Sequence, residues 1–143
     1  MKIISYNTYK CTKAKIEHIL ALGADLYILP ECFSQEHISL PEGYYMLWCG
    51  DDDLKEKGLG VIWKNHLNVQ MIPEYRKIKH MLPIIVDGAG LPKFILASCL
   101  LSGRKRRPTH SCYLKRSKSI LSTSIDTRQW WLVTSTAISV KAE

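Results

Sequence analysis

The feature that most constrains the fold is a pair of apolar segments with one amphipathic helix between them, at the start of the chain. Residues 2–7 form a short apolar run typical of a strand. Helical spacing of apolar residues predicts a helix over Lys13–Leu22, with Thr12 as its N-cap and Gly23 at its end. Asp25–Leu29 is nearly continuous in apolar residues and predicts a buried second strand. Two buried strands joined by a helix form a right-handed parallel unit.

A series of shorter apolar segments follows this unit, and turn-forming residues separate them. One β-α-β unit followed by a meander of strands predicts an α/β sandwich. The five further strands that we expect are Tyr44–Trp48, Gly60–Trp63, Leu67–Ile72, Pro83–Val86 and Phe94–Ala97.

The charge of the chain is divided unevenly between two parts. Residues 1–96 hold 11 Lys and Arg against 11 Asp and Glu, whereas residues 97–143 hold 9 against 2, so the whole net charge of +7 belongs to the second part. Serine and threonine rise from 5 to 14 across the same boundary. We therefore expect a folded part over residues 1–98 and a basic, Ser/Thr-rich tail over residues 99–143 that lacks stable structure.

Cysteine usage and hydropathy indicate the compartment. The five cysteines are odd in number and form no C-x-x-C pair, which argues against a disulfide framework or a zinc site and predicts a reducing cytoplasm. No apolar run approaches the length of about 18 residues that a membrane helix requires. The first residues lack the cleavage site of a secretory signal. The sequence predicts a cytoplasmic protein without a membrane partner.

Two polar residues stand where the first two strands end. Asn7 closes the first strand and Glu31 follows the second. Because the carboxyl ends of parallel strands meet at one edge of a sheet, both residues are expected at the edge where α/β proteins place their sites. A carboxylate is a hard oxygen ligand that suits Mg²⁺. The alternative is that Glu31 is a solvated residue and Asn7 a turn former.

The segments IISYN, ADLYILPE and GLGVIW resemble the opening of the endonuclease/exonuclease/phosphatase superfamily, which includes exonuclease III and DNase I. The resemblance covers residues 1–98. Tyr6 stands where the family usually has Trp, and Pro30 where it usually has Gln. Neither departure removes a metal ligand.

The resemblance implies a fold, a reaction and roles for two residues. The fold is the N-terminal portion of a DNase I-like, two-sheet α/β sandwich, here incomplete. Glu31 would bind a divalent metal, Mg²⁺ or Mn²⁺, and Asn7 would act as a catalytic and metal-supporting residue. The implied reaction is hydrolysis of a phosphodiester or phosphomonoester, in nucleic acid or in a smaller phosphate ester.

The resemblance stops after residue 98, where the family's Gly-Asp-x-Asn and Ser-Asp-His motifs are missing. Tryptophan has a single codon, so the DNA of the segment 130–136 is tightly constrained. Read from the third base of each codon, it can encode Val-Ala-Gly-Asp-Phe-Asn-Ser, which contains the first missing motif. We therefore expect a frameshift between about Ser98 and Gln129, and a truncated, inactive product. The alternative function is a non-enzymatic nucleic-acid-binding module that uses the basic cluster Arg104–Arg107.

Overall fold

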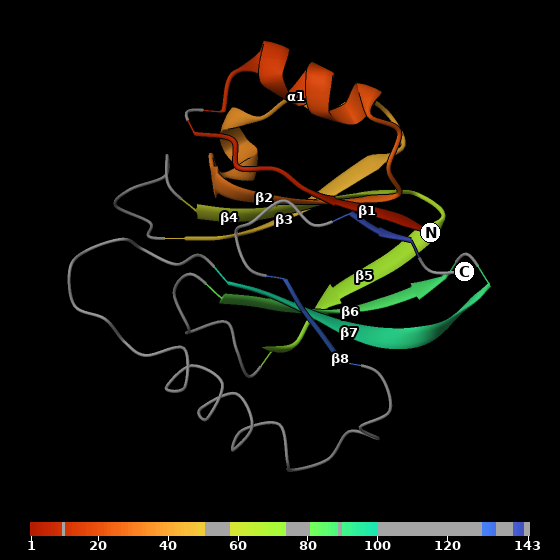
Figure 1. Ribbon diagram of the computed structural model, residues 1–143. Coiled ribbons are helices and arrows are strands. Elements are labelled where there is room, and N and C mark those ends of the chain that lie inside the picture. The colour runs from red at the N-terminus through yellow and green to blue at the C-terminus, as the bar shows by residue number, and fades with distance from the viewer. Residues whose placement is uncertain are drawn as a thin grey trace.

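The computed structural model describes residues 1–9, 11–50, 58–73, 81–88, 90–99, 130–133 and 139–141. These residues form an α/β structure with two sheets, which confirms the predicted fold class (Figure 1). The helices are α1 (Lys13–Ala21) and a short 3-10 turn, η1 (Gln35–His37). The strands are β1 (Lys2–Ser5), β2 (Leu26–Cys32), β3 (Tyr44–Cys49), β4 (Gly58–Lys64), β5 (Leu67–Met71), β6 (Met81–Gly88), β7 (Leu91–Cys99), β8 (Trp130–Val133) and β9 (Ser139–Lys141).

The opening unit forms as its sequence predicts. β1 and β2 pair in parallel, with Ile3 opposite Leu26 and Ser5 opposite Ile28. The side chain of Thr12 accepts a hydrogen bond from the backbone N–H of Lys15, so the expected N-cap is present. Gly23 follows the helix with a φ of +67°, a conformation that glycine adopts without a steric penalty. These two residues fix where α1 begins and ends.

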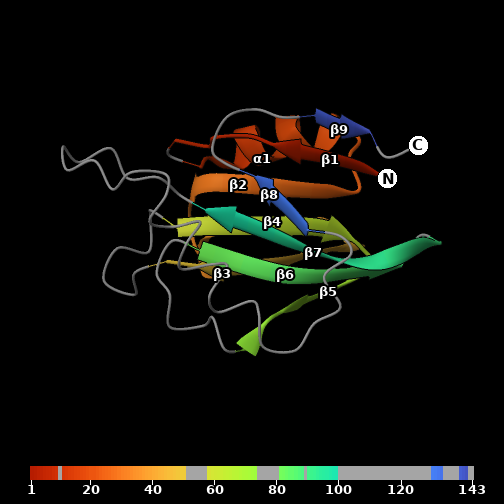
Figure 2. The same cartoon turned by 60° about the horizontal axis from the view of Figure 1, so that its bottom comes forward.

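The strands divide into two sheets that lie face to face. The first has the order β3-β4-β2-β1-β9, and the second has the order β5-β6-β7-β8. Helix α1 covers the face of the first sheet that points away from the second (Figure 1). A view from below shows β9 beside β1 at one edge of the first sheet (Figure 2).

Two apolar layers hold this arrangement together. The larger lies between the sheets and joins inward-facing residues of β1, β2 and β4 to those of β5, β6 and β7. The smaller lies between α1 and the first sheet, where Ile16, Ile19 and Leu20 pack on Tyr27 and Leu29. β2 contributes to both layers, since its residues are buried on either face.

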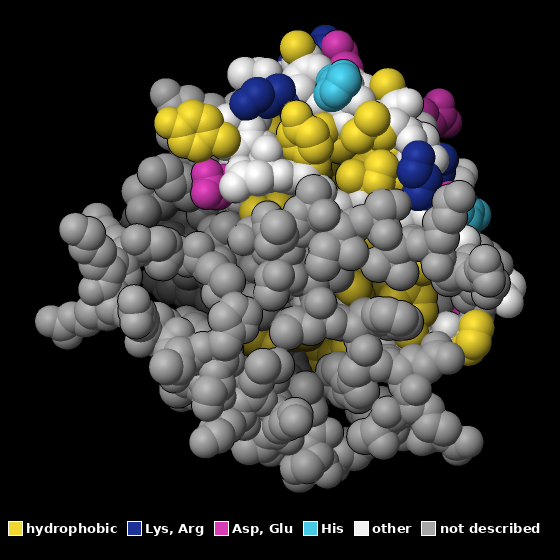
Figure 3. All heavy atoms as spheres, in the orientation of Figure 1, with side chains coloured by type: hydrophobic (Ala, Val, Ile, Leu, Met, Phe, Trp, Pro, Cys, Tyr) yellow, Lys and Arg dark blue, Asp and Glu magenta, His cyan; other side chains and the backbone are white. Residues whose placement is uncertain are grey.

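The outer surface of the helix and first sheet is mixed in character. Figure 3 shows basic, acidic and hydrophobic side chains interspersed over this part of the molecule. The large hydrophobic side chains that remain exposed in the described residues include Tyr6, Tyr9, Leu22 and Tyr45. Within the described residues, no helix has the length and apolar character that crossing a membrane requires.

Several strands are longer than predicted, and two differences from the predicted elements bear on the site and on the tail. β2 continues to Cys32 instead of ending at Leu29, because a bulge displaces Glu31 and pairing with β4 resumes at Cys32. The segment 99–143 contains β8 and β9, although no strand was expected there. β8 extends the second sheet through apolar residues parallel to β7, and β9 pairs with the free edge of β1. The other residues of that segment from 100 onward lie outside the described residues.

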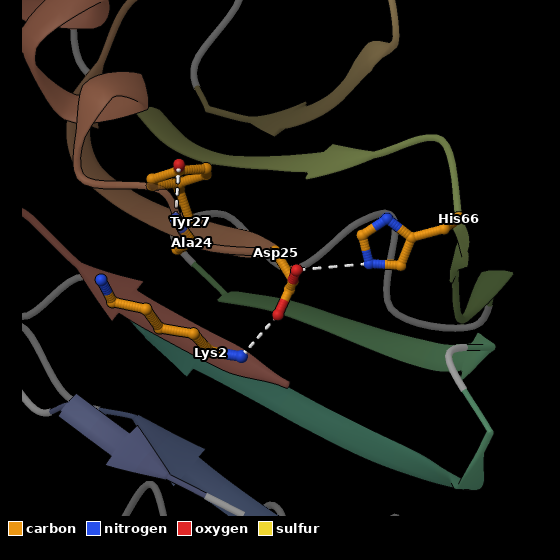
Figure 4. Close-up of polar contacts among 5 residues, drawn as sticks. All are labelled: Lys2, Ala24, Asp25, Tyr27 and His66. Atoms are coloured by element: carbon orange, nitrogen blue, oxygen red, sulfur yellow. Dashed lines mark hydrogen bonds and ion pairs between the residues drawn. The ribbon is translucent and has the colours of Figure 1, made fainter.

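The beginnings of β1 and β2 are fastened by one carboxylate. Asp25 Oδ2 accepts a hydrogen bond of 2.6 Å from the backbone N–H of Lys2, and Asp25 Oδ1 lies 3.3 Å from His66 Nε2 (Figure 4). Next to it, the Tyr27 hydroxyl accepts from the N–H of Ala24 and donates to Leu20 O. Each of these polar groups has a partner inside the fold, so this end of the strand pair is closed.

Candidate functional site

Strand ends from both sheets meet at the opposite end of the sandwich. β1, β2 and β7 run in the same direction, and all three finish at this end (Figures 1 and 2). Asn7 lies just beyond β1, Glu31 lies near the end of β2, and Ser98 lies near the end of β7. The structure thus brings the two predicted site residues to one end of the molecule.

Thr8 joins the two strand ends. Its backbone N–H donates to Pro30 O at 3.0 Å, and its hydroxyl lies 3.0 Å from Pro30 O and 2.8 Å from Glu31 O. Thr8 is completely buried. Because Thr8 follows Asn7 directly, these hydrogen bonds place the backbone of Asn7 beside the bulge that carries Glu31.

The amide of Asn7 folds back on its own loop. Its Oδ1 accepts a hydrogen bond of 3.0 Å from the backbone N–H of Tyr9, which is the turn-forming role considered for Asn7. An amide oxygen has two lone pairs, so one remains for a ligand. Asn7 itself is exposed. The turn and the proposed supporting role are therefore compatible.

Glu31 is held in an unusual backbone conformation. Its φ is +56°, a left-handed value that residues with a Cβ adopt at a cost of about 1–2 kcal/mol. The conformation arises from the bulge between Pro30 and Cys32. The side chain is half-buried, and no described residue makes a hydrogen bond or ion pair with its carboxylate. Strain and an unengaged carboxylate at one residue are typical of a functional position.

The bulge is supported from the neighbouring strands. Trp48 on β3 donates a hydrogen bond of 3.0 Å from Nε1 to the carbonyl oxygen of Cys32. The indole lies so close to Gly58 on β4 that a Cβ there would come within 2.2 Å of the ring. Glycine at position 58 therefore makes room for Trp48, and Trp48 in turn holds the end of β2.

Lysine 15 brings a positive charge to the same loop. Its Nζ donates to Thr8 O at 2.8 Å and to Tyr9 O at 2.6 Å. These contacts tie the first turn of α1 to the segment that follows Asn7. The loop is therefore fixed on one side by Lys15 and on the other by the hydrogen bonds of Thr8.

Two buried cysteines lie beneath the loop. Cys32 donates a hydrogen bond to the sulfur of Cys11, with the two Sγ atoms 3.9 Å apart. This hydrogen bond lowers the pKa of the Cys11 thiol to about 7, and smaller contributions come from the backbone N–H of Phe33, from Thr8 and from Lys15. The same contact, together with burial, raises the pKa of Cys32. The pair thus holds its first dissociable proton weakly and its second strongly.

The donor set at this end fits one part of a hard-metal site. Glu31 supplies an anionic oxygen and Asn7 a neutral one, which are the ligand types that Mg²⁺ and Mn²⁺ prefer. Among the described residues, no three His, Cys, Asp or Glu side chains cluster closely enough to hold a metal ion. Glu31 supplies a carboxylate at this end, and Mg²⁺ is commonly held by one or two carboxylates together with waters and substrate oxygens.

Several residues that support this end of the molecule were not predicted from the sequence. Thr8, Lys15 and Trp48 were not singled out, although a glycine inside a strand, such as Gly58, marks a place where another group approaches the backbone closely. Ser98 was also missed, and its buried hydroxyl has no hydrogen-bond partner among the described residues. The predicted basic cluster Arg104–Arg107 lies outside the described residues.

No protein-family model matches the sequence, and no curated protein matches it in a sequence comparison. Solved structures do match. The endonuclease domain of TRAS1, a telomere-specific non-LTR retrotransposon, has a TM-score of 0.61 and 14% identity over 83% of this chain and 52% of that one. ANGEL2, a 2′,3′-cyclic phosphatase, has a TM-score of 0.51 and 16% identity over 74% of this chain and 42% of that one.

A third solved structure is the endonuclease/exonuclease/phosphatase from Beutenbergia cavernae DSM 12333, with a TM-score of 0.49 and 16% identity over 92% of this chain and 46% of that one. The first two similarities confirm, at the level of the fold, the resemblance drawn from the sequence. The chain has part of a DNase I-like α/β sandwich, and it spans about half the length of these structures.

Proposed function

We propose that residues 1–98 are the N-terminal portion of a divalent-metal-dependent phosphoesterase that hydrolyses nucleic acid or a smaller phosphate ester. One observation carries the proposal. The carboxylate of Glu31 is engaged by no described residue and lies at a strained bulge beside Asn7, in a fold similar to that of an endonuclease and a phosphatase. The sequence features noted above favour the cytoplasm as its compartment.

Each residue at this end has a distinct role in the proposal. Glu31 is the anionic ligand of Mg²⁺ or Mn²⁺, and Asn7 supports the metal–phosphate site with its second lone pair. Thr8 and Trp48 are positioning residues, since they act on the backbone of β2. A divalent ion at such a site supplies Lewis-acid polarisation of a phosphoryl oxygen.

The 143-residue chain is proposed to be inactive by itself. The sequence contains neither a Gly-Asp-x-Asn motif nor a Ser-Asp-His motif, so the family's groups that orient and activate the attacking water are missing. Residues that act as a unit lose nearly all activity when the first of them is removed.

The tail is proposed to be the out-of-frame product of a frameshift between about Ser98 and Gln129. The parallel pairing of β8 with β7 supports a strand at the place where the resemblance expects the lead-in to Gly-Asp-x-Asn. Sequencing the coding DNA tests this part directly. Codons for Gly-Asp-x-Asn, and later for Ser-Asp-His, in the alternative frame are the expected result. An intact in-frame tail shared by independent isolates would instead favour the nucleic-acid-binding module.

The activity is tested by assaying the chain and a frame-restored protein on a generic phosphodiester and on plasmid DNA. Each reaction is run with Mg²⁺ and with chelator. We expect no turnover by the 143-residue chain, chelator-sensitive turnover by the restored protein, and loss of that turnover in Glu31→Gln. Chelator-sensitive turnover by the chain as it stands, abolished by Glu31→Gln, would contradict the proposed inactivity.

A further inference from the structure

The two cysteines beneath the candidate site lie on segments that are already fastened together. Cys11 follows the loop that contains Thr8, and Cys32 ends the bulge that contains Glu31. Hydrogen bonds from Thr8 to Pro30 and Glu31 join these two segments without involving either sulfur. The backbone therefore holds the two thiols near each other whatever their redox state.

The separation of the two sulfur atoms suits reversible cross-linking. They lie 3.9 Å apart in the thiol form, and a disulfide bond is about 2.05 Å long, so closure requires an approach of about 2 Å. We infer that Cys11 and Cys32 form a redox-active dithiol, which a hydroperoxide converts to a disulfide that ties the loop after Asn7 to the bulge of Glu31.

The environment gives the two cysteines different parts in the reaction. Cys11 keeps 4% of its surface exposed and Cys32 keeps none, so the oxidant reaches Cys11 first. The hydrogen bond from Cys32 favours the thiolate of Cys11, and the thiolate is the form that attacks. Cys32 then serves as the resolving thiol.

The proposed step balances in two stages. The Cys11 thiol first releases its proton to water. The thiolate then attacks the terminal oxygen of the hydroperoxide, the O–O bond breaks, and a sulfenic acid forms; the alkoxide or hydroxide that leaves takes up one proton from water and becomes an alcohol or water. Cys32 sulfur then attacks the sulfenic sulfur, the S–O bond breaks, and water leaves with the Cys32 proton. Two thiols are oxidised and one hydroperoxide is reduced. An added thiol reverses the link by exchange.

Peptide mapping of the whole chain tests this inference. Cleavage after glutamate places Cys11 in residues 1–17, Cys32 in residues 32–36 and Cys49 in residues 43–56, while Cys99 and Cys112 share residues 75–143. The 11–32 link therefore has a mass that no other pairing gives. The reduced protein is treated with one equivalent of hydrogen peroxide, free thiols are blocked with a maleimide, and the digest is analysed before and after reduction.

We expect a dominant species that joins 1–17 to 32–36, about 2 Da lighter than the sum of its peptides, and separated by reductant. Cys49→Ser should keep this link, because Cys49 Sγ lies near Met81 O instead. Cys32→Ser should stop at a Cys11 sulfenic acid. Links that mainly involve other cysteines, or a wild-type chain that remains folded by circular dichroism and forms no 11–32 link, would overturn the inference.

Discussion

The two ends of the β1–β2 strand pair each carry a carboxylate, and the two are treated differently by the fold. Asp25 at the start of β2 accepts a backbone hydrogen bond from Lys2 and faces His66. Glu31 near the end of β2 is engaged by no described side chain and sits at a φ of +56°. The Asp25 carboxylate links the beginnings of β1 and β2, whereas Glu31 is held in a strained backbone conformation and its carboxylate has no partner among the described residues.

This difference separates a carboxylate that stabilises the fold from one whose position costs the fold stability. A group that only stabilises the protein is expected to be satisfied and unstrained, as Asp25 is. Strain that is maintained by the surroundings, here by Thr8 and Trp48, is typical of positions whose conformation serves binding or chemistry. The contrast yields predictions that separate the two carboxylates by experiment.

The largest effect is expected at the closed end. Asp25→Ala removes the acceptor of the Lys2 N–H and the partner of His66, and should lower the free energy of unfolding by about 1–2 kcal/mol. Glu31→Gln removes a charge with no described partner and should change it by less than about 0.5 kcal/mol. Urea denaturation of both variants measures the difference. Equal losses would show that Glu31 also has a structural partner.

A second effect concerns the thiols of the site end. The pKa of Cys11 is lowered to about 7 by the hydrogen bond from Cys32, with help from the Phe33 backbone, Thr8 and Lys15. Because the thiolate is the reactive form, the rate of peroxide-driven linkage should rise about tenfold from pH 6 to pH 8 and then level off.

Removing the hydrogen-bond donor provides the matched control. In Cys32→Ala, the first oxidation of Cys11 should continue to rise above pH 8, since an ordinary thiol dissociates at about pH 8.5. Stopped-flow or quenched maleimide labelling across this pH range gives both profiles. A wild-type rate that keeps rising to pH 9 would contradict the lowered pKa.

A smaller effect tests the strain at the bulge. In an ordinary strand, alanine is more stabilising than glycine by about 0.5–1 kcal/mol. At position 31 the order should invert, with Glu31→Gly more stable than Glu31→Ala by up to about 1 kcal/mol, because only glycine adopts a positive φ freely. Thermal and urea unfolding of the two variants decide this. The ordinary order would mean that the left-handed conformation is absent.

Local pattern was enough to predict the opening of the fold. The helical period of Ile16, Ile19 and Leu20 and the cap at Thr12 are properties of the nearby sequence, and α1 forms where they predict it. The strand β6 begins two residues earlier than expected, because Pro83 suggests a strand boundary and here lies inside the strand.

Features that depend on distant contacts could not be predicted. The left-handed conformation of Glu31 results from hydrogen bonds with Thr8 and from pairing of Cys32 with Gly58, none of which leaves a pattern around residue 31. The contact between Cys11 and Cys32 likewise joins positions 21 residues apart. β8 and β9 were missed because their segment has no consistent apolar period, and only pairing with β7 and β1 makes them strands.

The central claim is that the open end of the strand pair binds a divalent metal and the closed end does not. Paramagnetic broadening of backbone NMR amide signals by substoichiometric Mn²⁺ tests it in the 143-residue chain. A bound Mn²⁺ ion broadens the signals of the amides nearest to it, even when binding is weak. We predict that signals of Thr8, Glu31 and Cys32 broaden first, that Lys2 and Asp25 stay sharp, and that Glu31→Gln removes the effect. Broadening centred on Asp25, or broadening near Glu31 that persists in Glu31→Gln, would contradict the account.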